Sequence, residues 1–330
     1  MPCTPDTRGS MGALSALLVE ASNTSGDPCV PATFDDNSEI YVILQENLRY
    51  TDELIGNKGL TGTIDRTKAY SRHGARVVAG QITLQVGTFD LDGWLPRIMG
   101  NPASGDTFAM DDEFNLVPFD IMVKRDLGTA IYRHCGVRAA VFNCQASGGE
   151  GQILTLTLDI VGFEEHTSTY PSPAPAVSTN NRAYWLIGDA ELSLTPSGGS
   201  SGEYFFDSFS LRIDNGLTPL IRNFLHPTAL QSRGREVTLR ASTPYTSASH
   251  TSLYINEFRG GGSISFTDKD STGEPQTASS TTFTLNDLVS IRRTPSITGP
   301  GEIPLFIDMV AHRSGSTAPL SVTNVYVSEP

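Results

Sequence analysis

The chain has 330 residues, 38% of them hydrophobic, and 36 acidic against 23 basic residues give it a net charge of −13. This apolar content excludes a wholly disordered chain, and no apolar run reaches the roughly 18–20 residues needed to cross a bilayer. Because a negative surface repels phosphate, the charge also disfavours a protein that grips nucleic acid.

Residue composition favours a β protein without catalytic chemistry. The chain contains 31 glycines and 20 prolines, and Ser/Thr clusters recur along it, which is typical of short strands joined by turns. We find no nucleophile motif, phosphate-binding loop or metal-ligand spacing, so we expect no enzyme, cofactor or metal. The four cysteines, Cys3, Cys29, Cys135 and Cys144, are expected to be free thiols, with a Cys135–Cys144 bridge as the alternative.

The N-terminal part is predicted to be an arm followed by a strand and a basic loop. Residues 1–39 combine one apolar stretch with a run rich in Pro and Asp, and strand signals begin at residue 40. Residues 57–80 are rich in glycine and unusually basic for so acidic a chain. This loop is predicted either to dock on an acidic surface of another copy or to stay solvated. Its basic residues are Lys58, Arg66, Lys68, Arg72 and Arg76.

The rest of the chain alternates in the manner of β-strands. Residues 81–86 (QITLQV) and 153–162 (ILTLTLDIVG) place apolar and polar side chains on opposite faces, and a short helix follows the first of them. Residues 168–187, with three prolines, are predicted to be a linker. Alternation resumes at FSLRID in the second part of the chain.

Two matched stretches indicate an internal repeat. QITLQVGTFDLDGWLPRIMGNP resembles SFSLRIDNGLTPLIRNFLHPT, with Leu84 on Phe209 and Leu95 on Leu220, and each copy is predicted to be a strand, a turn and a short helix. Likewise LTLDIVGFE resembles PLFIDMVAH, with Asp159 on Asp308. The predicted fold is therefore mainly β: two tandem duplicated antiparallel β-sandwich or open-barrel modules, residues 40–167 and 188–330, each with a short helix.

Four stretches together resemble a known family: LLVEASNTSGDP with ENLRYTDELIGNKGLTGTIDR, RHGARVVAGQITLQVGTFDLDGWLPRIMG, YRHCGVRAAVFNCQASGGEGQILTLTLDIVGFEE and FDSFSLRIDNGLTPLI. In this order they resemble the bacteriophage tail tube proteins of long, non-contractile tails. The resemblance implies a structural protein of the virion, assembled in the host cytoplasm into stacked rings that conduct the genome during ejection. It also implies that the arm and the long loop reach the adjacent ring.

The same resemblance implies partners and a channel wall. The implied partners are further copies of the chain, a tape measure protein, tail terminator and distal tail proteins, and genomic DNA that passes without specific binding; no membrane is expected. Because the chain is duplicated, we expect trimeric rings of pseudo-sixfold symmetry, with true hexamers as the alternative. Polar faces of the alternating strands would line the channel: Gln81, Thr83, Gln85, Thr155, Thr157, Asp159, Ser208, Ser210, Arg212 and Asp214. Arg212 would then need a carboxylate partner, for which Asp214 is the candidate.

Two other functions fit the same alternation. A tail terminator or distal tail protein would form one ring and would not polymerise. A carbohydrate-binding or adhesive β-sandwich would need clustered exposed aromatic side chains, whereas Trp94 and Trp185 lie in segments that we expect to be packed.

Overall fold

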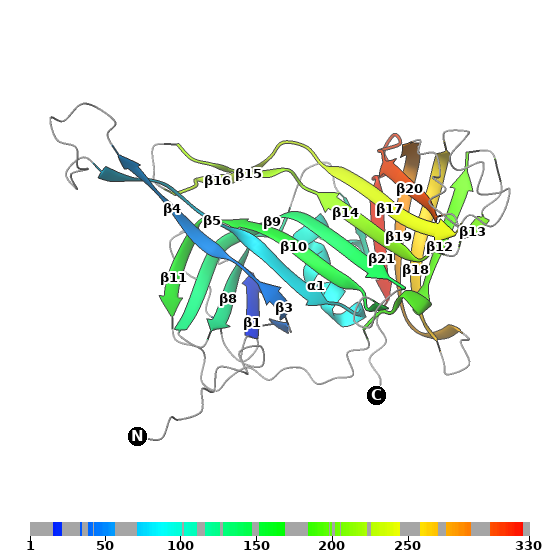
Figure 1. The fold of residues 1–330 in the computed structure, drawn as a ribbon, viewed down its shortest axis with the longest axis horizontal. Coiled ribbons are helices and arrows are strands. Elements are labelled where there is room, and N and C mark those ends of the chain that lie inside the picture. The colour runs from blue at the N-terminus through cyan, green and yellow to red at the C-terminus, as the bar shows by residue number, and fades with distance from the viewer. Residues whose placement is uncertain are drawn as a thin grey trace, which may run out of the picture.

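The computed structural model describes residues 16–21, 34, 39–41, 43–56, 71–100, 102–110, 116–125, 128–146, 152–168, 184–197, 199, 202–204, 206–222, 226–244, 258–269, 275–291 and 304–325. Antiparallel strands dominate these residues (Figure 1). Helical structure among them consists of α1 (Thr88–Met99) and the short 3-10 turn η4 (Ile187–Asp189). Neither of these helices is long and apolar enough to cross a membrane.

In the first half, antiparallel pairing joins the strands in the order β2–β1–β8–β9–β10–β5–β4, with β11 also on β9 and β3 also on β5. The strands are β1 (Ala16–Ala21), β2 (Glu39–Tyr41), β3 (Ile43–Glu46), β4 (Arg49–Gly56), β5 (Ser71–Gln85), β8 (Phe119–Arg125), β9 (Gly128–Gln145), β10 (Thr155–Gly162) and β11 (Glu164–Ser168). The first residues of β9 pair with β8 and β11, and the later ones pair with β10. One long strand thus belongs to both layers of a sandwich.

The second half repeats this pairing scheme in the order β13–β12–β18–β19–β20–β17–β14, with β21 also on β19. The strands are β12 (Ala190–Pro196), β13 (Gly202–Tyr204), β14 (Ser208–Asp214), β17 (Glu236–Pro244), β18 (Arg259–Lys269), β19 (Pro275–Ile291), β20 (Pro304–Ala311) and β21 (Leu320–Val325). Each strand therefore has a counterpart in the first half; β9 corresponds to β19, β10 to β20, and β4 to β14.

Both long strands also bend in the same way. His134 in β9 and Asp287 in β19 have backbone φ angles of 47° and 44°, which few residues other than glycine adopt. Each lies where its strand leaves one layer of the sandwich and enters the other. The two halves thus share a local distortion as well as a pairing order.

The two halves are joined edge to edge. β14 pairs with β9 over seven residue pairs, from Ser208 opposite Gln145 to Asp214 opposite Ala139. One sheet therefore runs through β5, β10, β9, β14, β17 and β20, and we call these six strands the shared sheet (Figure 1). Two short strands, β6 (Pro102–Ser104) and β7 (Thr107–Ala109), add a second link, because β7 pairs with β21.

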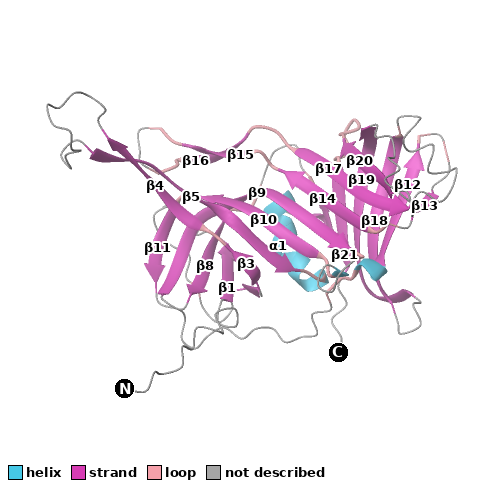
Figure 2. Cartoon of the chain, in the orientation of Figure 1, coloured by secondary structure: helices cyan, strands magenta, loops and turns pink. Residues whose placement is uncertain are grey.

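The core lies beneath the shared sheet. Alternate residues of β5 and β10 are buried because strand side chains alternate between faces; they include Val78, Ile82, Leu84, Leu156 and Leu158. Helix α1 lies against this face (Figure 2) and buries Trp94, whose ring meets Phe119 edge to face at 5.7 Å. Fully burying a leucine side chain such as Leu156 stabilises the fold by roughly 1.5–3 kcal/mol.

A chain of buried polar groups ties α1 to the second half. Trp185 Nε1 donates to Thr281 Oγ1, which donates to Asn324 Oδ1, and Asn324 Nδ2 donates to the Thr88 carbonyl at the start of α1. Buried polar groups are tolerated when they are paired in this way. Helix α1 therefore packs against both halves.

Three sequence-based predictions are corrected here. Ala16–Ala21, assigned to the N-terminal arm, is a core strand in which Leu17, Leu18 and Val19 are fully buried against β8 and β2. The predicted loop over 57–80 is already strand β5 from Ser71, because this segment pairs with β4. Residues 57–70 and most of the predicted linker, residues 169–183, lie outside the described residues.

The third correction concerns the helix expected after FSLRID. Leu217–Leu220 is a strand, β15, that pairs with β16 (Ala229–Ser232). The first matched stretch therefore aligned β5 and α1 with β14 and β15, whereas the pairing scheme makes β4 the counterpart of β14. The second match, Asp159 on Asp308, agrees with the pairing scheme.

Candidate functional site: the polar face of the shared sheet

The polar residues of β5 and β10 lie opposite each other on one face of the shared sheet. Gln85 pairs with Thr155, Thr83 with Thr157 and Gln81 with Asp159. Cross-strand neighbours share a face, and the hydroxyl oxygens of Thr83 and Thr157 are 3.2 Å apart. This side is the opposite of the one that buries Leu84 and Leu158.

The polar face continues into the second half through β9. Asn143 lies opposite Thr155 on β10 and opposite Ser210 on β14, and Ala139 lies opposite both Asp159 and Asp214. The structure therefore places all ten sequence-predicted channel residues on one face: Gln81, Thr83, Gln85, Thr155, Thr157, Asp159, Ser208, Ser210, Arg212 and Asp214.

Further members of this face were missed in the sequence. β17 pairs with β14 and β20, which adds Arg240 opposite Ser210 and Asp308, and Ser242 opposite Ser208. The alternation of Glu236, Thr238, Arg240 and Ser242 in EVTLRAS carries the same signal as QITLQV and could have identified β17. Arg138 had no such signal, because it lies in a β-bulge between Val137 and Ala139.

Three arginines on this face each contact an aspartate. Arg138 donates two hydrogen bonds to Asp159, both at 2.9 Å; Arg212 Nη2 lies 2.6 Å from Asp214 Oδ2; and Arg240 Nε lies 3.3 Å from Asp308 Oδ1. The pairing of Arg212 with Asp214 confirms the contact predicted from the sequence. Since each of these cations has a carboxylate beside it, the three pairs add little net charge to this face.

The chemistry of Asp214 reflects its neighbours. Partial burial acts to raise its pKa, but hydrogen bonds from Arg212 and from the Gly216 amide, together with nearby positive charge, lower the pKa overall. Asp214 is thus more firmly ionised than an isolated aspartate, which keeps Arg212 neutralised near neutral pH.

A shallow depression of about 170 Å³ lies on this face where β9, β14, β17 and β20 meet. Asn143, Ser210, Arg240, Phe306 and Asp308 line it. Pockets for small-molecule ligands usually measure about 300–1,000 Å³, so this depression is too small for that use. Over the ranges that the structure describes, no three His, Cys, Asp or Glu side chains gather closely enough to hold a metal ion.

These features combine a polar sheet face spanning two halves with a buried opposite face. A family model described as phage tail tube protein matches residues 12–319. The chain belongs to the phage tail tube protein family. Comparison with curated proteins gives no significant match. The family match supports a structural component of the virion tail that assembles into stacked rings, and nothing in it favours a terminator, a distal tail protein or a carbohydrate-binding protein.

In this tail tube protein, the basic candidates for contact with the next ring are only partly described. Lys58, Arg66 and Lys68 lie outside the described residues, and of Arg72 the structure describes the backbone alone, in β5. Arg76 lies on β5 opposite Asp52 of β4, and its Nη2 is 3.4 Å from Asp52 Oδ2. Arg76 therefore links the two strands of a hairpin.

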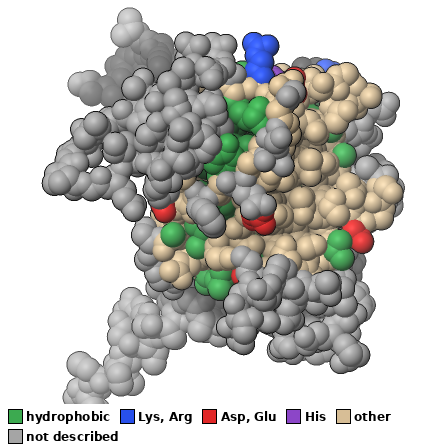
Figure 3. Space-filling view, turned by 90° about the vertical axis from the view of Figure 1, so that its right-hand side faces the viewer, with side chains coloured by type: hydrophobic (Ala, Val, Ile, Leu, Met, Phe, Trp, Pro, Cys, Tyr) green, Lys and Arg blue, Asp and Glu red, His purple; other side chains and the backbone are tan. Residues whose placement is uncertain are grey.

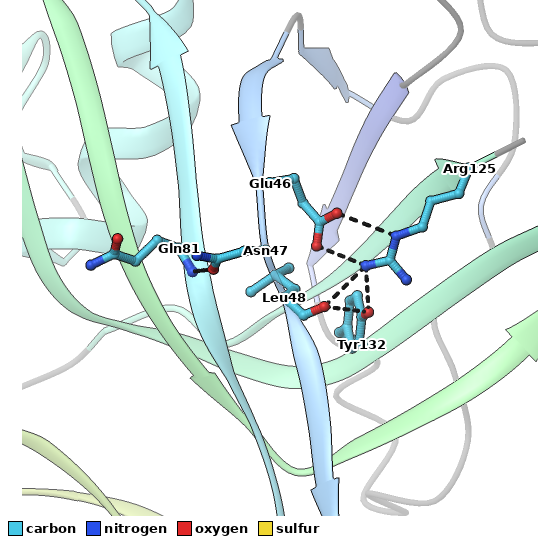
Figure 4. A network of polar contacts seen from close by, with 6 residues as sticks. All are labelled: Glu46, Asn47, Leu48, Gln81, Arg125 and Tyr132. Atoms are coloured by element: carbon cyan, nitrogen blue, oxygen red, sulfur yellow. Dashed lines mark hydrogen bonds and ion pairs between the residues drawn. The ribbon is translucent and has the colours of Figure 1, made fainter. Parts of the chain in front are cut away.

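A hydrogen-bond network around Arg125 holds the connection between β3 and β4 (Figure 4). Arg125 Nη2 donates to Glu46 Oε1, to the Leu48 carbonyl and to Tyr132 Oη, at 2.8–3.0 Å, and the Tyr132 hydroxyl also donates to Leu48 O. Burial raises the pKa of Tyr132 to about 12, so the hydroxyl stays protonated and continues to donate. The network holds the chain where it passes from β3 to β4 along the edge of the sheet.

Two cysteines of the tail tube protein are described, and both are free thiols in β9. Cys135 and Cys144 are buried, and burial raises the pKa of both, that of Cys144 to about 11. The alternative of a Cys135–Cys144 bridge is therefore wrong. Cys3 and Cys29 lie outside the described residues.

Proposed function

We propose that three copies of this tail tube protein form each ring, with the polar face of the shared sheet lining the channel. The observation that carries this proposal is the continuity of that face. Ten residues chosen from separate segments of the sequence lie on one side of a single sheet that crosses both halves.

The repeated pairing scheme supports three copies. Each chain holds two similarly built halves, joined side by side through β9 and β14. Three chains then supply six such units around the axis. Closure of a sheet into a barrel leaves no exposed edge, and a ring of this kind would protect the edges of the wide antiparallel sheet.

The wall chemistry supports passage of DNA without retention. Duplex DNA carries one negative charge per roughly 1.7 Å of its length, and cationic surfaces bind it by releasing counterions. On the polar face of the shared sheet, Arg138, Arg212 and Arg240 each have an aspartate beside them, so the charge that these three arginines offer to phosphate is compensated. Threonines, serines and glutamines supply hydration without charge.

Contacts between rings are proposed for the β4–β5 hairpin. Its far end projects from the body of the molecule (Figure 1), and it carries Arg72 and Arg76. A tape measure protein inside the growing tube, and terminator and distal tail proteins at its two ends, complete the set of proposed partners. DNA is cargo and is not specifically bound.

Electron microscopy of the purified protein tests the stoichiometry. Hollow tubes whose axial averages contain three copies per ring are expected. Six copies per ring would favour the hexameric alternative, and a protein that stays monomeric at high concentration, with a tail-tip initiator supplied, would overturn the ring proposal.

A further inference from the structure

Each half contains a hairpin that extends beyond its sheet, but the two hairpins take different courses. β4 and β5 stay paired as far as Gly56 opposite Ser71, and this hairpin projects from the body of the molecule (Figure 1). Their counterparts β14 and β17 stop pairing at Asp214 opposite Glu236, and the chain between them forms the separate hairpin β15–β16. This second hairpin lies against the first half, at its base and at its tip.

Two glycines direct the second hairpin away from β14 and β17. Gly216 has a backbone φ of 57°, a conformation that residues with a Cβ rarely adopt. A Cβ at this position would also lie 2.5 Å from the carbonyl oxygen of Gly234, on the returning part of the chain. The close approach of these two glycines thus sets the bend at the base of the hairpin.

The base of the hairpin lies on β9 at Gly136. A Cβ at position 136 would lie 2.9 Å from Leu217 Cδ1 and 3.0 Å from Leu230 Cδ1, distances that ordinary packing does not allow. Leu217 is only 4% exposed. Because Gly136 has no side chain, the two leucines can pack directly on the backbone of the strand.

The tip of the hairpin reaches both layers of the first half. His226 Nδ1 lies 3.5 Å from Glu164 Oε1 in β11, and its ring stacks on that of Tyr50 in β4, with 6.5 Å between the centroids. The Glu164 carboxylate also contacts His166, at 2.9 Å, and Arg133, at 3.9 Å. Because β4 continues the shared sheet and β11 belongs to the other layer, the tip spans the end of the sandwich. We call the three contact points the seat: Gly136, Tyr50 and Glu164.

The second half has a valine at the position of Gly136. Gly136 lies opposite Val161 of β10, and Val289 lies opposite Val310 of β20. Val161 and Val310 each lie two residues after the matched aspartates, so Val289 is the counterpart of Gly136. Its side chain would occupy the space that the two leucines use in the first half.

The carboxylate of the seat is also replaced in the second half. Glu164 lies opposite the residue before the bend in β9, and the Pro319 carbonyl accepts a hydrogen bond from the residue before the bend in β19. Pro319 is therefore the counterpart of Glu164, and its side chain offers no charge to a histidine. The described surface at the end of the molecule beyond the second half shows few Asp or Glu side chains (Figure 3). The seat thus belongs to the first half.

We infer that β15–β16 is an intramolecular strap that stays on the seat of its own chain in the assembled tube, so that each chain offers one projecting hairpin, β4–β5, to the adjacent ring. This inference rests on the proposed ring and specifies its contacts: a ring of three chains makes three hairpin contacts with the next ring, although it contains six halves. In such a ring the place equivalent to the seat lies on the second half of the neighbouring copy, where Val289 and Pro319 would not receive a hairpin in the same way. The β4–β5 hairpin is therefore left to contact another ring.

Blocking the seat tests whether the strap is held there. Gly136→Val gives β9 the side chain that β19 carries at the same position, and valine is well accommodated in strands. Amide hydrogen exchange of Leu217–Leu220 and Ala229–Ser232 should lose protection in this variant, while β10 stays protected. Gly188→Val, at a position where a Cβ would meet nothing within 4 Å, is the control and should leave exchange unchanged.

Unchanged protection of the strap in the Gly136→Val variant would overturn the inference, because the hairpin would then be held without the seat. If this variant does not fold, His226→Ala with Glu164→Gln replaces it, and the same loss of protection is expected. Neither measurement needs an assembled tube, so both stay decisive if the ring proposal fails.

Deletion of residues 217–235 tests the strap by assembly. It joins Asp214 to its partner Glu236 through Asn215 and Gly216, and Asn-Gly is the favoured two-residue hairpin turn. Rings of this variant should still stack, because the strap contacts its own chain; rings that no longer stack would overturn the inference.

A reconstruction of the unmodified tube counts the contacts and decides if the shortened chain does not fold. One β4–β5 hairpin per chain should cross to the adjacent ring, with His226 against Glu164 of its own chain. Two crossing hairpins per chain, or His226 against another ring, would overturn the inference and leave the ring intact. Absence of rings would overturn the proposed function instead.

Discussion

Asp159 of β10 and Asp308 of β20 occupy equivalent positions in the two halves, and each is neutralised by an arginine from a neighbouring strand. The arginines themselves are not equivalent: Arg138 reaches Asp159 from β9, whereas Arg240 reaches Asp308 from β17, on the opposite side. In the first half, the position that corresponds to Arg240 is occupied by Gln81, which lies opposite Asp159. The two halves thus reach the same charge balance through different residues, which suggests that neutrality of this face matters more than any one pair.

Removing both aspartates should make the channel hold DNA. Asp159→Asn with Asp308→Asn leaves Arg138 and Arg240 without partners, and each uncompensated cation that contacts phosphate adds about 0.9 to the salt dependence of binding, as the slope of log K against log salt. We expect slower genome ejection from particles carrying this tube, with the delay largest at low salt.

Further substitution of Arg138→Gln and Arg240→Gln provides the control, since it removes the unpaired cations without restoring the acids. Ejection should then return to the wild-type rate. An unchanged rate in the double aspartate variant would count against a channel position for this face.

The Arg212–Asp214 pair should stabilise the fold in a pH-dependent way. The pKa of Asp214 is lowered in the folded protein, relative to about 3.9 in an unfolded chain. Its contribution is therefore fully present above about pH 4 and is lost as the pH falls through the lower, folded pKa. Asp214→Asn should lower the thermal midpoint at pH 7, and the difference from wild type should shrink towards pH 2. Asp207→Asn, at an exposed position before β14, serves as the control.

Close approach of β12 to β18 requires glycine at position 260. A Cβ there would collide with the Thr195 carbonyl oxygen and come within 2.9 Å of Pro196 Cα, both backbone atoms. Gly260→Ala should therefore lower the free energy of unfolding by about 1–3 kcal/mol, the usual effect of overpacking. Gly188→Ala, where a Cβ would meet nothing within 4 Å, should be neutral in the same denaturant titration.

Asn215 links helix α1 to the shared sheet from a fully buried position. Its Nδ2 donates to the Ile98 carbonyl of α1 and to the Val137 carbonyl of β9, both at 3.0 Å. Asn215→Ala should lower the free energy of unfolding by about 1–3 kcal/mol, because two buried acceptors lose their donor. Asn215→Asp should be worse, since a carboxylate would face those carbonyls. Equal stability of Asn215→Asp and wild type would show that the side chain makes no such bonds.

The sequence predicted which residues share a face better than it predicted which strands are equivalent. Alternation is local, so Thr155, Thr157 and Asp159 could be assigned to one side without knowing their neighbours. Strand partners are set at long range. Ala16–Ala21 looked like part of an arm because its partner, β8, begins about a hundred residues later.

The incorrect prediction of a helix after FSLRID also arose because strand partners are set at long range. The three-residue spacing of Leu217 and Leu220 resembles that of Leu91 and Trp94 in α1, but Leu217–Leu220 has a hairpin partner in Ala229–Ser232. Tertiary pairing therefore decides between helix and strand for a short apolar segment. By contrast, the match of Asp159 with Asp308 agrees with the structure, because β10 and β20 have equivalent neighbouring strands in the two halves.

A cryo-electron microscopy reconstruction of the assembled tube would show directly which side of the shared sheet faces the axis. We expect Thr157, Asp159, Ser210 and Asp308 to point into the channel, with α1 on the far side of the sheet. A map in which this polar face contacts solvent outside the tube, or a neighbouring ring, would contradict this expectation.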